Sequence, residues 1–203
     1  MVINIRFLKT LKLGTTYNTD QLQNRYRIQL SVRNRVHMAS VQKISTCLWF
    51  DTEALEAAQF YTAIFKNASI GRITRYGKEG FEYHQKPEGS VMTVEFTLDG
   101  TPFLALNGGS IFKFSEAISF IIHCSDQDEV DYFWEKLTEE GDPAAQQCGW
   151  LKDKYGVSWQ VIPVEMVDLL NDPDTEKSQK VMAAMLPMKK IDLATLKEVY
   201  ARG

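Results

Sequence analysis

Residues 117–141 read AISFIIHCSDQDEVDYFWEKLTEEG, a stretch in which the hydrophobic pattern changes period. The apolar run 117–124 predicts a short strand. The segment 125–141 has an Asp-rich start, apolar residues at helical spacing and a terminal glycine, which predicts a helix. The stretch therefore predicts a strand that leads directly into a helix, the first sign of a mixed α+β fold.

The same succession occurs earlier in the chain. Residues 43–50, KISTCLWF, predict a strand, and residues 51–65, DTEALEAAQFYTAIF, predict a helix that buries one face. Turn residues and alternating patterns predict three strands after this helix, at 69–77, 90–100 and 103–109. After the later helix we expect shorter strands at 143–147, 149–153 and 157–163. The two halves thus form a weak internal duplication with a period of roughly 70 residues.

Helical patterns return at the end of the chain, where Pro173 and Pro187 mark breaks. We expect four parts, with boundaries as follows: a basic N-terminal extension over 1–42, a first module over 43–110, a second module over 116–163 and C-terminal helices over 164–203. Residues 1–37 contain many Lys and Arg and Asp20 as their only acid. An upstream extension, a targeting segment and a basic arm all fit this composition, and we favour an accessory extension that takes no part in the chemistry.

The composition excludes several functional classes. The chain has 203 residues and a net charge of -3, so it lacks the overall basic character of a nucleic-acid-binding protein. No apolar run approaches the length of a membrane span. Cys47, Cys124 and Cys148 show no Cys-x-x-Cys pairing, which favours reduced thiols and a cytoplasmic location.

Five stretches of this sequence are similar to the PhnB-like branch of the glyoxalase, or vicinal oxygen chelate, superfamily: FDTEALEAAQFYTAIF, GSVMTVEFTLDGTPFLALNGG, EAISFIIHC, QCGWLKDKYGVSWQVIP and VMAAMLPMKKIDLATLKEVY. The resemblance implies two paired βαβββ modules that form a cup-shaped sheet, and a homodimer. Members often carry the label demethylubiquinone methyltransferase. The residues give that label no support, because no Gly-rich loop follows a first strand as S-adenosylmethionine binding would require.

Strand alternation indicates which side chains share a face. We expect Ser45, Cys47 and Trp49 to face the cup, together with Ala105 or Asn107. On the strand at 117–124 the expected cup residues include Ser119 and His123, and on the last strand Gln160. The full predicted ligand pocket, with Trp150 as an aromatic wall, is Ser45, Cys47, Trp49, Asn107, Ser119, Trp150 and Gln160.

The superfamily's metal ligands occupy four strand positions, and the matching positions here read Ser45, Asn107 or Ala105, Ser119 and Gln160. Hydroxyls and amides are weak ligands for transition metals, so we expect no metal and no other cofactor. His123 and Glu95 are the polar groups that we expect to take part in any reaction. Histidine titrates near neutral pH, and a carboxylate inside a cup would have a perturbed pKa.

The sequence therefore predicts a homodimeric PhnB-like protein that binds a small organic molecule and has neither a nucleic-acid nor a membrane partner. Whether it catalyses a reaction stays open. Two alternatives remain: a metal-dependent lyase, isomerase or dioxygenase with ligands elsewhere, and a mainly structural dimeric module.

Overall fold

The computed structural model describes residues 43–203, and residues 44–203 form one compact unit. The expected N-terminal extension, 1–42, lies outside the described residues except for its boundary at Lys43. In the described part of the chain, no helix is both long enough and apolar enough to cross a bilayer.

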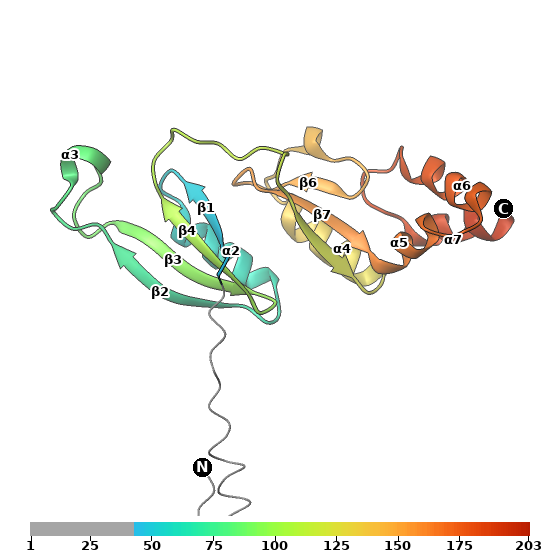
Figure 1. Ribbon diagram of the computed structural model, residues 1–203, viewed down its shortest axis with the longest axis horizontal. Helices are drawn as coiled ribbons and strands as arrows, with labels where there is room; N and C mark the ends of the chain where they lie inside the picture. The colour runs from blue at the N-terminus through green and yellow to red at the C-terminus, as the bar shows by residue number, and fades with distance from the viewer. Residues whose placement is uncertain (1–42) are drawn as a thin grey trace, which may run out of the picture. The chain divides into compact units, whose positions relative to one another are not determined.

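The first module contains a four-stranded sheet with one long helix. Its elements are β1 (Thr46–Phe50), α2 (Ala54–Ile64), β2 (Ser69–Arg75), the short α3 (Phe81–His84), β3 (Val91–Leu98) and β4 (Thr101–Asn107). The strand order is β1-β4-β3-β2, with β1 parallel to β4 and the other pairs antiparallel (Figure 1). This sheet is called the first sheet below.

The second module repeats the plan with one strand fewer. It consists of β5 (Phe120–Cys124), α4 (Gln127–Thr138), a short 3-10 turn (Pro143–Ala145), β6 (Trp150–Lys152) and β7 (Ser158–Pro163). The second sheet has the order β5-β7-β6. The strand expected at 143–147 is replaced by the 3-10 turn, because Pro143 starts it and the Asp142 carboxylate accepts a 2.9 Å bond from the Ala144 amide.

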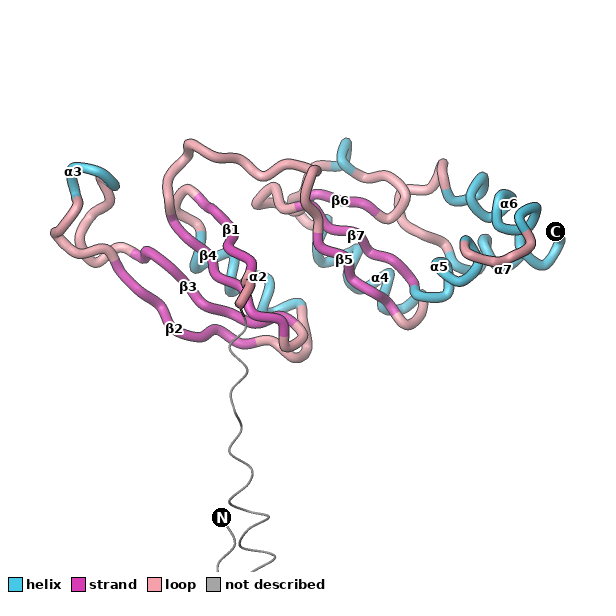
Figure 2. The backbone as a smooth tube through the Cα atoms, viewed as in Figure 1, coloured by secondary structure: helices cyan, strands magenta, loops and turns pink. Residues whose placement is uncertain are grey.

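Three helices complete the chain, as expected: α5 (Val164–Leu170), α6 (Thr175–Met185) and α7 (Leu193–Arg202) (Figure 2). They enclose a small core of their own, centred on Met166, Val181 and Leu196. Gln127 of α4 fastens the segment before α7, since its amide nitrogen donates to Ile191 O and its amide oxygen accepts from the Leu193 amide. The mixed α+β fold with a C-terminal helical part confirms the predicted fold class.

Each sheet is covered on one face by its own helix, α2 on the first and α4 on the second. The two helices touch, because the Tyr132 hydroxyl of α4 donates to Ile64 O of α2 at 2.8 Å. Apolar side chains from both modules form one shared core. The opposite face of each sheet carries most of the side chains predicted to be functional, with Asn107 as the exception.

Candidate functional site

The uncovered face of the first sheet holds most of the residues predicted from the first module. Cys47 and Glu95 both pair with Leu104, and Trp49 pairs with Leu106, so these five side chains share one face. Cys47 is exposed and the other four are half-buried, whereas their neighbours Leu48 and Phe50 are buried under α2. We call this group the first open face. It combines apolar surface with one carboxylate and one thiol.

Glu95 does not lie free on this face, because the Arg72 guanidinium forms an ion pair with its carboxylate. The two residues come from adjacent strands, at a point where the β2–β3 register shifts. Gly71 makes room there, since a Cβ at this position would lie 3.2 Å from the Glu95 Cβ. Glu95 also lines a cavity of about 360 Å³ together with Ser45, which directly precedes β1.

Trp49 is held in place by the segment that leaves β4. Its indole nitrogen donates to Gly109 O at 2.7 Å, and Phe112 contacts its ring edge-on with centroids 5.0 Å apart. Gly108 permits this approach, because a Cβ there would lie 2.2 Å from the indole ring. Trp49 therefore presents a fixed apolar surface.

The second sheet has a corresponding open face. Ile121 pairs with Gln160, and Gln160 pairs with Trp150, which places the three side chains in one row. Ser119 belongs to the same group, since the Gln160 amide nitrogen donates to its hydroxyl at 2.9 Å. His123 lies two residues beyond Ile121 on β5 and is exposed. These five residues form the second open face, and the neighbouring Ile162 is buried among side chains of the C-terminal helices.

Asn107 differs from the expectation. It pairs with Phe50, so it lies on the face covered by α2 and not with Trp49, and it is 5% exposed. Its amide oxygen accepts a 2.8 Å bond from the Ala54 amide at the start of α2, and its amide nitrogen donates to Val91 O at 3.0 Å. The side chain caps a helix from a neighbouring strand. Ala105, the other candidate at this strand end, is fully buried on the same face.

His123 and Glu95 stand on different sheets and line different cavities. Over residues 43–203, no three His, Cys, Asp or Glu side chains are grouped as a metal site would need. Burial raises the pKa of two thiols. For Cys124 burial, together with the nearby carboxylates of Glu129 and Asp126, raises the pKa to about 12, and burial also raises the pKa of Cys47. The three cysteines are free.

A buried carboxylate that the sequence did not single out joins the two modules. Asp153 accepts bonds of 2.8 Å from both the Tyr61 hydroxyl and the Trp159 indole nitrogen, and it also accepts the Tyr155 and Val157 amides. Burial raises the pKa of Asp153, against the effect of these four bonds. Nothing in the local pattern LKDKYG distinguishes this aspartate from an exposed turn residue.

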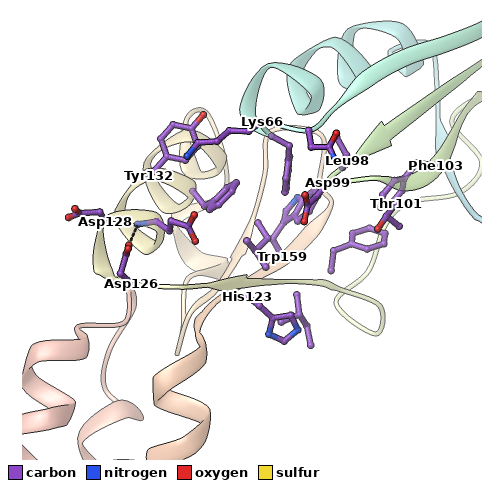
Figure 3. A pocket seen from close by; sticks show the side chains of 17 residues that line it. Lys66, Leu98, Asp99, Thr101, Phe103, His123, Asp126, Asp128, Tyr132 and Trp159 are labelled. Atoms are coloured by element: carbon purple, nitrogen blue, oxygen red, sulfur yellow. Dashed lines mark hydrogen bonds between the residues drawn. The ribbon is translucent and has the colours of Figure 1, made fainter.

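A cavity of about 810 Å³ lies where the two modules meet (Figure 3). We call it the junction cleft. The ends of α2, β3 and β4 line one side, and β5, β7 and the first turns of α4 line the other. His123 is the only one of the nine predicted site residues at its margin, and Figure 3 shows His123 on the opposite side of β5 from Trp159.

Known proteins share sequence and fold with this chain. Residues 42–162 match the family model described as 3-demethylubiquinone-9 3-methyltransferase. A Bacillus cereus PhnB protein, provisionally named a 3-demethylubiquinone-9 3-methyltransferase, is 34% identical; the match covers 61% of this chain and 100% of that one, with a TM-score of 0.53. A Staphylococcus aureus protein is 26% identical over 61% of this chain and 97% of its own, with a TM-score of 0.27. No curated protein matches the chain.

Proposed function

Because the chain belongs to the PhnB-like family described as 3-demethylubiquinone-9 3-methyltransferase, with a glyoxalase-like fold, we propose that it binds a small organic molecule on its open sheet faces as a homodimer. One observation carries the proposal. Of the nine residues selected from sequence, all but Asn107 lie on, or directly beside, the two faces that the helices leave uncovered. The family's descriptive name supplies no mechanism, and the proposal includes no methyl transfer.

The open faces offer the mixture of surfaces that a small-molecule site needs. Trp49, Trp150, Leu104 and Ile121 supply apolar area, and a few polar groups among them can orient a ligand. His123 offers an exposed imidazole, and Gln160 with Ser119 offers a paired amide and hydroxyl. Glu95 is fixed by Arg72, so the two together present a carboxylate and a guanidinium at defined positions.

A second copy of the chain is the partner that this surface fits. Large apolar side chains stay exposed on and beside the open faces, including Ile121 at 51%, Phe112 at 61% and Ile118 at 74%. Exposed apolar groups gathered in this way mark an interaction surface. The nearby charges occur in opposite pairs, Glu95 with Arg72 and Glu116 with Lys152, so that two copies of the face do not repel each other.

Native mass spectrometry of untagged protein, purified without chelator, tests this proposal. We expect a dimer mass, with a small organic adduct that is lost in the variant Trp150→Ala and weakened in His123→Ala. Tyr83→Ala is the matched control, since Tyr83 is 86% exposed on α3 and lines neither of the two cavities described above. A monomer at micromolar concentration would contradict the dimer, and one metal ion per chain would replace the proposal with the metal-dependent enzyme.

A ligand search with the purified protein separates binding from a purely structural role. The protein is titrated with a library of small aromatic and carbonyl compounds, and binding is followed by intrinsic tryptophan fluorescence, to which Trp49 and Trp150 on the open faces contribute. We expect a saturable change that His123→Ala reduces and that Glu95→Gln alters. A dimer whose open faces bind none of the compounds would leave only the structural module.

A further inference from the structure

We propose that the junction cleft is a second binding site, for a flat aromatic molecule that carries a positive charge. Of the residues that form the open faces, it shares only Ile121 and His123, and it does not depend on the function proposed for those faces. At about 810 Å³ the cavity has the size of a small-molecule site. Such sites often form where two modules of a fold meet.

The floor of the cleft is a continuous band of aromatic rings. Phe103 contacts Phe120 and Phe120 contacts Trp159, each with centroids 5.3 Å apart. Trp159 in turn contacts Phe65 at 5.9 Å, and Phe65 contacts Phe133 at 5.1 Å. Phe65 and Phe103 come from the first module and the other three rings from the second. The band is therefore fixed by contacts from both sides, and we call it the aromatic floor.

Contacts with other core residues also fix two of these rings in place. Trp159 is 2% exposed, and its indole nitrogen is anchored to the buried Asp153. Phe103 is 8% exposed and stacks on Phe96 of the shared core at 5.3 Å. The half-buried Phe65, Phe120 and Phe133 supply the ring surface that a flat ligand can cover, and because the buried rings hold them in place they lose little side-chain entropy on binding.

The rim of the cleft determines the charge of the ligand. Asp99, Asp126, Asp128 and Glu129 line the cleft, and among residues 43–203 Lys66 is the only Lys or Arg that does so. In Figure 3 Asp99 turns toward Trp159, whereas Lys66 extends toward Tyr132. Asp126 and Glu129 are held by their capping bonds to the Glu129 and Ser125 amides. The negative ring faces and the acidic rim both attract a cation and disfavour an anion.

Three indoles that share one ring system and carry side chains of different charge test the proposal: tryptamine, a cation; tryptophol, which is neutral; and indole-3-acetate, an anion. Binding to the full chain is followed by backbone amide chemical shifts. We expect saturable shifts at Lys66, Thr101 and Tyr132, with tryptamine binding at least about fivefold more tightly than tryptophol and indole-3-acetate weakest. Shifts that centre on Trp150 and Ser119 would assign the indoles to the open face and overturn the second site.

Two isosteric changes test the role of the rim. Asp99 has a φ of 45°, which asparagine also tolerates, and glutamine can replace Glu129 in its capping bond. We expect D99N/E129Q to weaken tryptamine about fivefold and to leave tryptophol unchanged. The control E82Q/E139Q removes two exposed carboxylates outside the cleft and should change neither. Equal binding of the three indoles, or an equal effect of both double variants, would overturn the charge preference.

Discussion

Replacement of Tyr61 by phenylalanine should expose how much the buried Asp153 cluster contributes to joining the modules. The Tyr61 ring is fully buried and packs near Phe96 and Trp159, so phenylalanine keeps the packing and removes only the hydroxyl. Burial, reinforced by Asp153, raises the pKa of Tyr61 well above its ordinary value, which keeps the hydroxyl protonated as a donor. The change therefore removes one hydrogen bond to a carboxylate.

A hydrogen bond to a charged group contributes about 1.5–3 kcal/mol, because the buried charge has no water to replace the lost donor. The Asp153 carboxylate keeps its three other bonds, from Trp159 and two backbone amides, so we expect a value near the middle, about 2 kcal/mol. For a domain of this size that loss lowers the melting temperature by about 4–8 °C.

Tyr132→Phe provides the matched control. Its hydroxyl also crosses between the modules, but it donates to the neutral carbonyl of Ile64 and the side chain is 38% exposed. We expect a loss of about 0.5–1 kcal/mol for this variant. Urea unfolding of wild type and both variants at pH 7 gives the comparison. If Tyr61→Phe loses no more free energy of unfolding than Tyr132→Phe, the buried carboxylate does not strengthen its hydrogen bond and the reasoning is wrong.

Three further changes test other features of the structure. Burial raises the pKa of Asp153 in the folded chain above the unfolded value of about 3.9. The contribution of Asp153 to the free energy of unfolding should therefore fall as the pH rises from the unfolded pKa through the folded one. Urea titrations of wild type and Asp153→Asn between pH 4 and 7 measure this change. Gly108→Ala should displace the Trp49 ring at a cost of about 1–3 kcal/mol, visible as a red-shifted indole emission and a lower melting temperature; an unchanged spectrum would contradict the close approach. Asn107→Ala should destabilise the chain by about 2 kcal/mol and increase amide exchange at the start of α2, whereas unchanged exchange would show that Asn107 is free to serve a ligand.

Sequence pattern alone predicted the two-module plan and the order of the main strands and helices, but it missed α3 and predicted a strand at 143–147 where the chain forms a 3-10 turn. Apolar periodicity separates strands from helices along the chain, and each element from β1 to α7 is short enough for this local signal to apply. Alternation also showed correctly that Cys47 and Trp49 share a face opposite Leu48 and Phe50. Local pattern was sufficient here, because the positions within one strand fix their own relative faces.

How the faces of different strands combine depends on tertiary contacts that the pattern of a single strand does not contain. Alternation predicts that Ala105 and Asn107 share a face of β4, but it does not predict which face of β4 packs against the helix. Because these two residues pair with the buried Leu48 and Phe50 of β1, both lie under α2. The ion pair of Glu95 with Arg72 likewise depends on the irregular register between β2 and β3. Register is a property of two strands, so neither outcome is present in the pattern of one.

The Asp153 cluster and the aromatic floor depend on still longer separations. Tyr61 and Asp153 are 92 residues apart in the chain, and the floor combines rings from both modules. In the sequence, Phe65, Phe103 and Trp159 are ordinary core candidates, and Asp153 resembles a turn residue. The three rings line a cleft, and Asp153 is buried, only because the two modules pack against each other. At this contact apolar side chains are removed from water and the desolvated carboxylate is satisfied by hydrogen bonds.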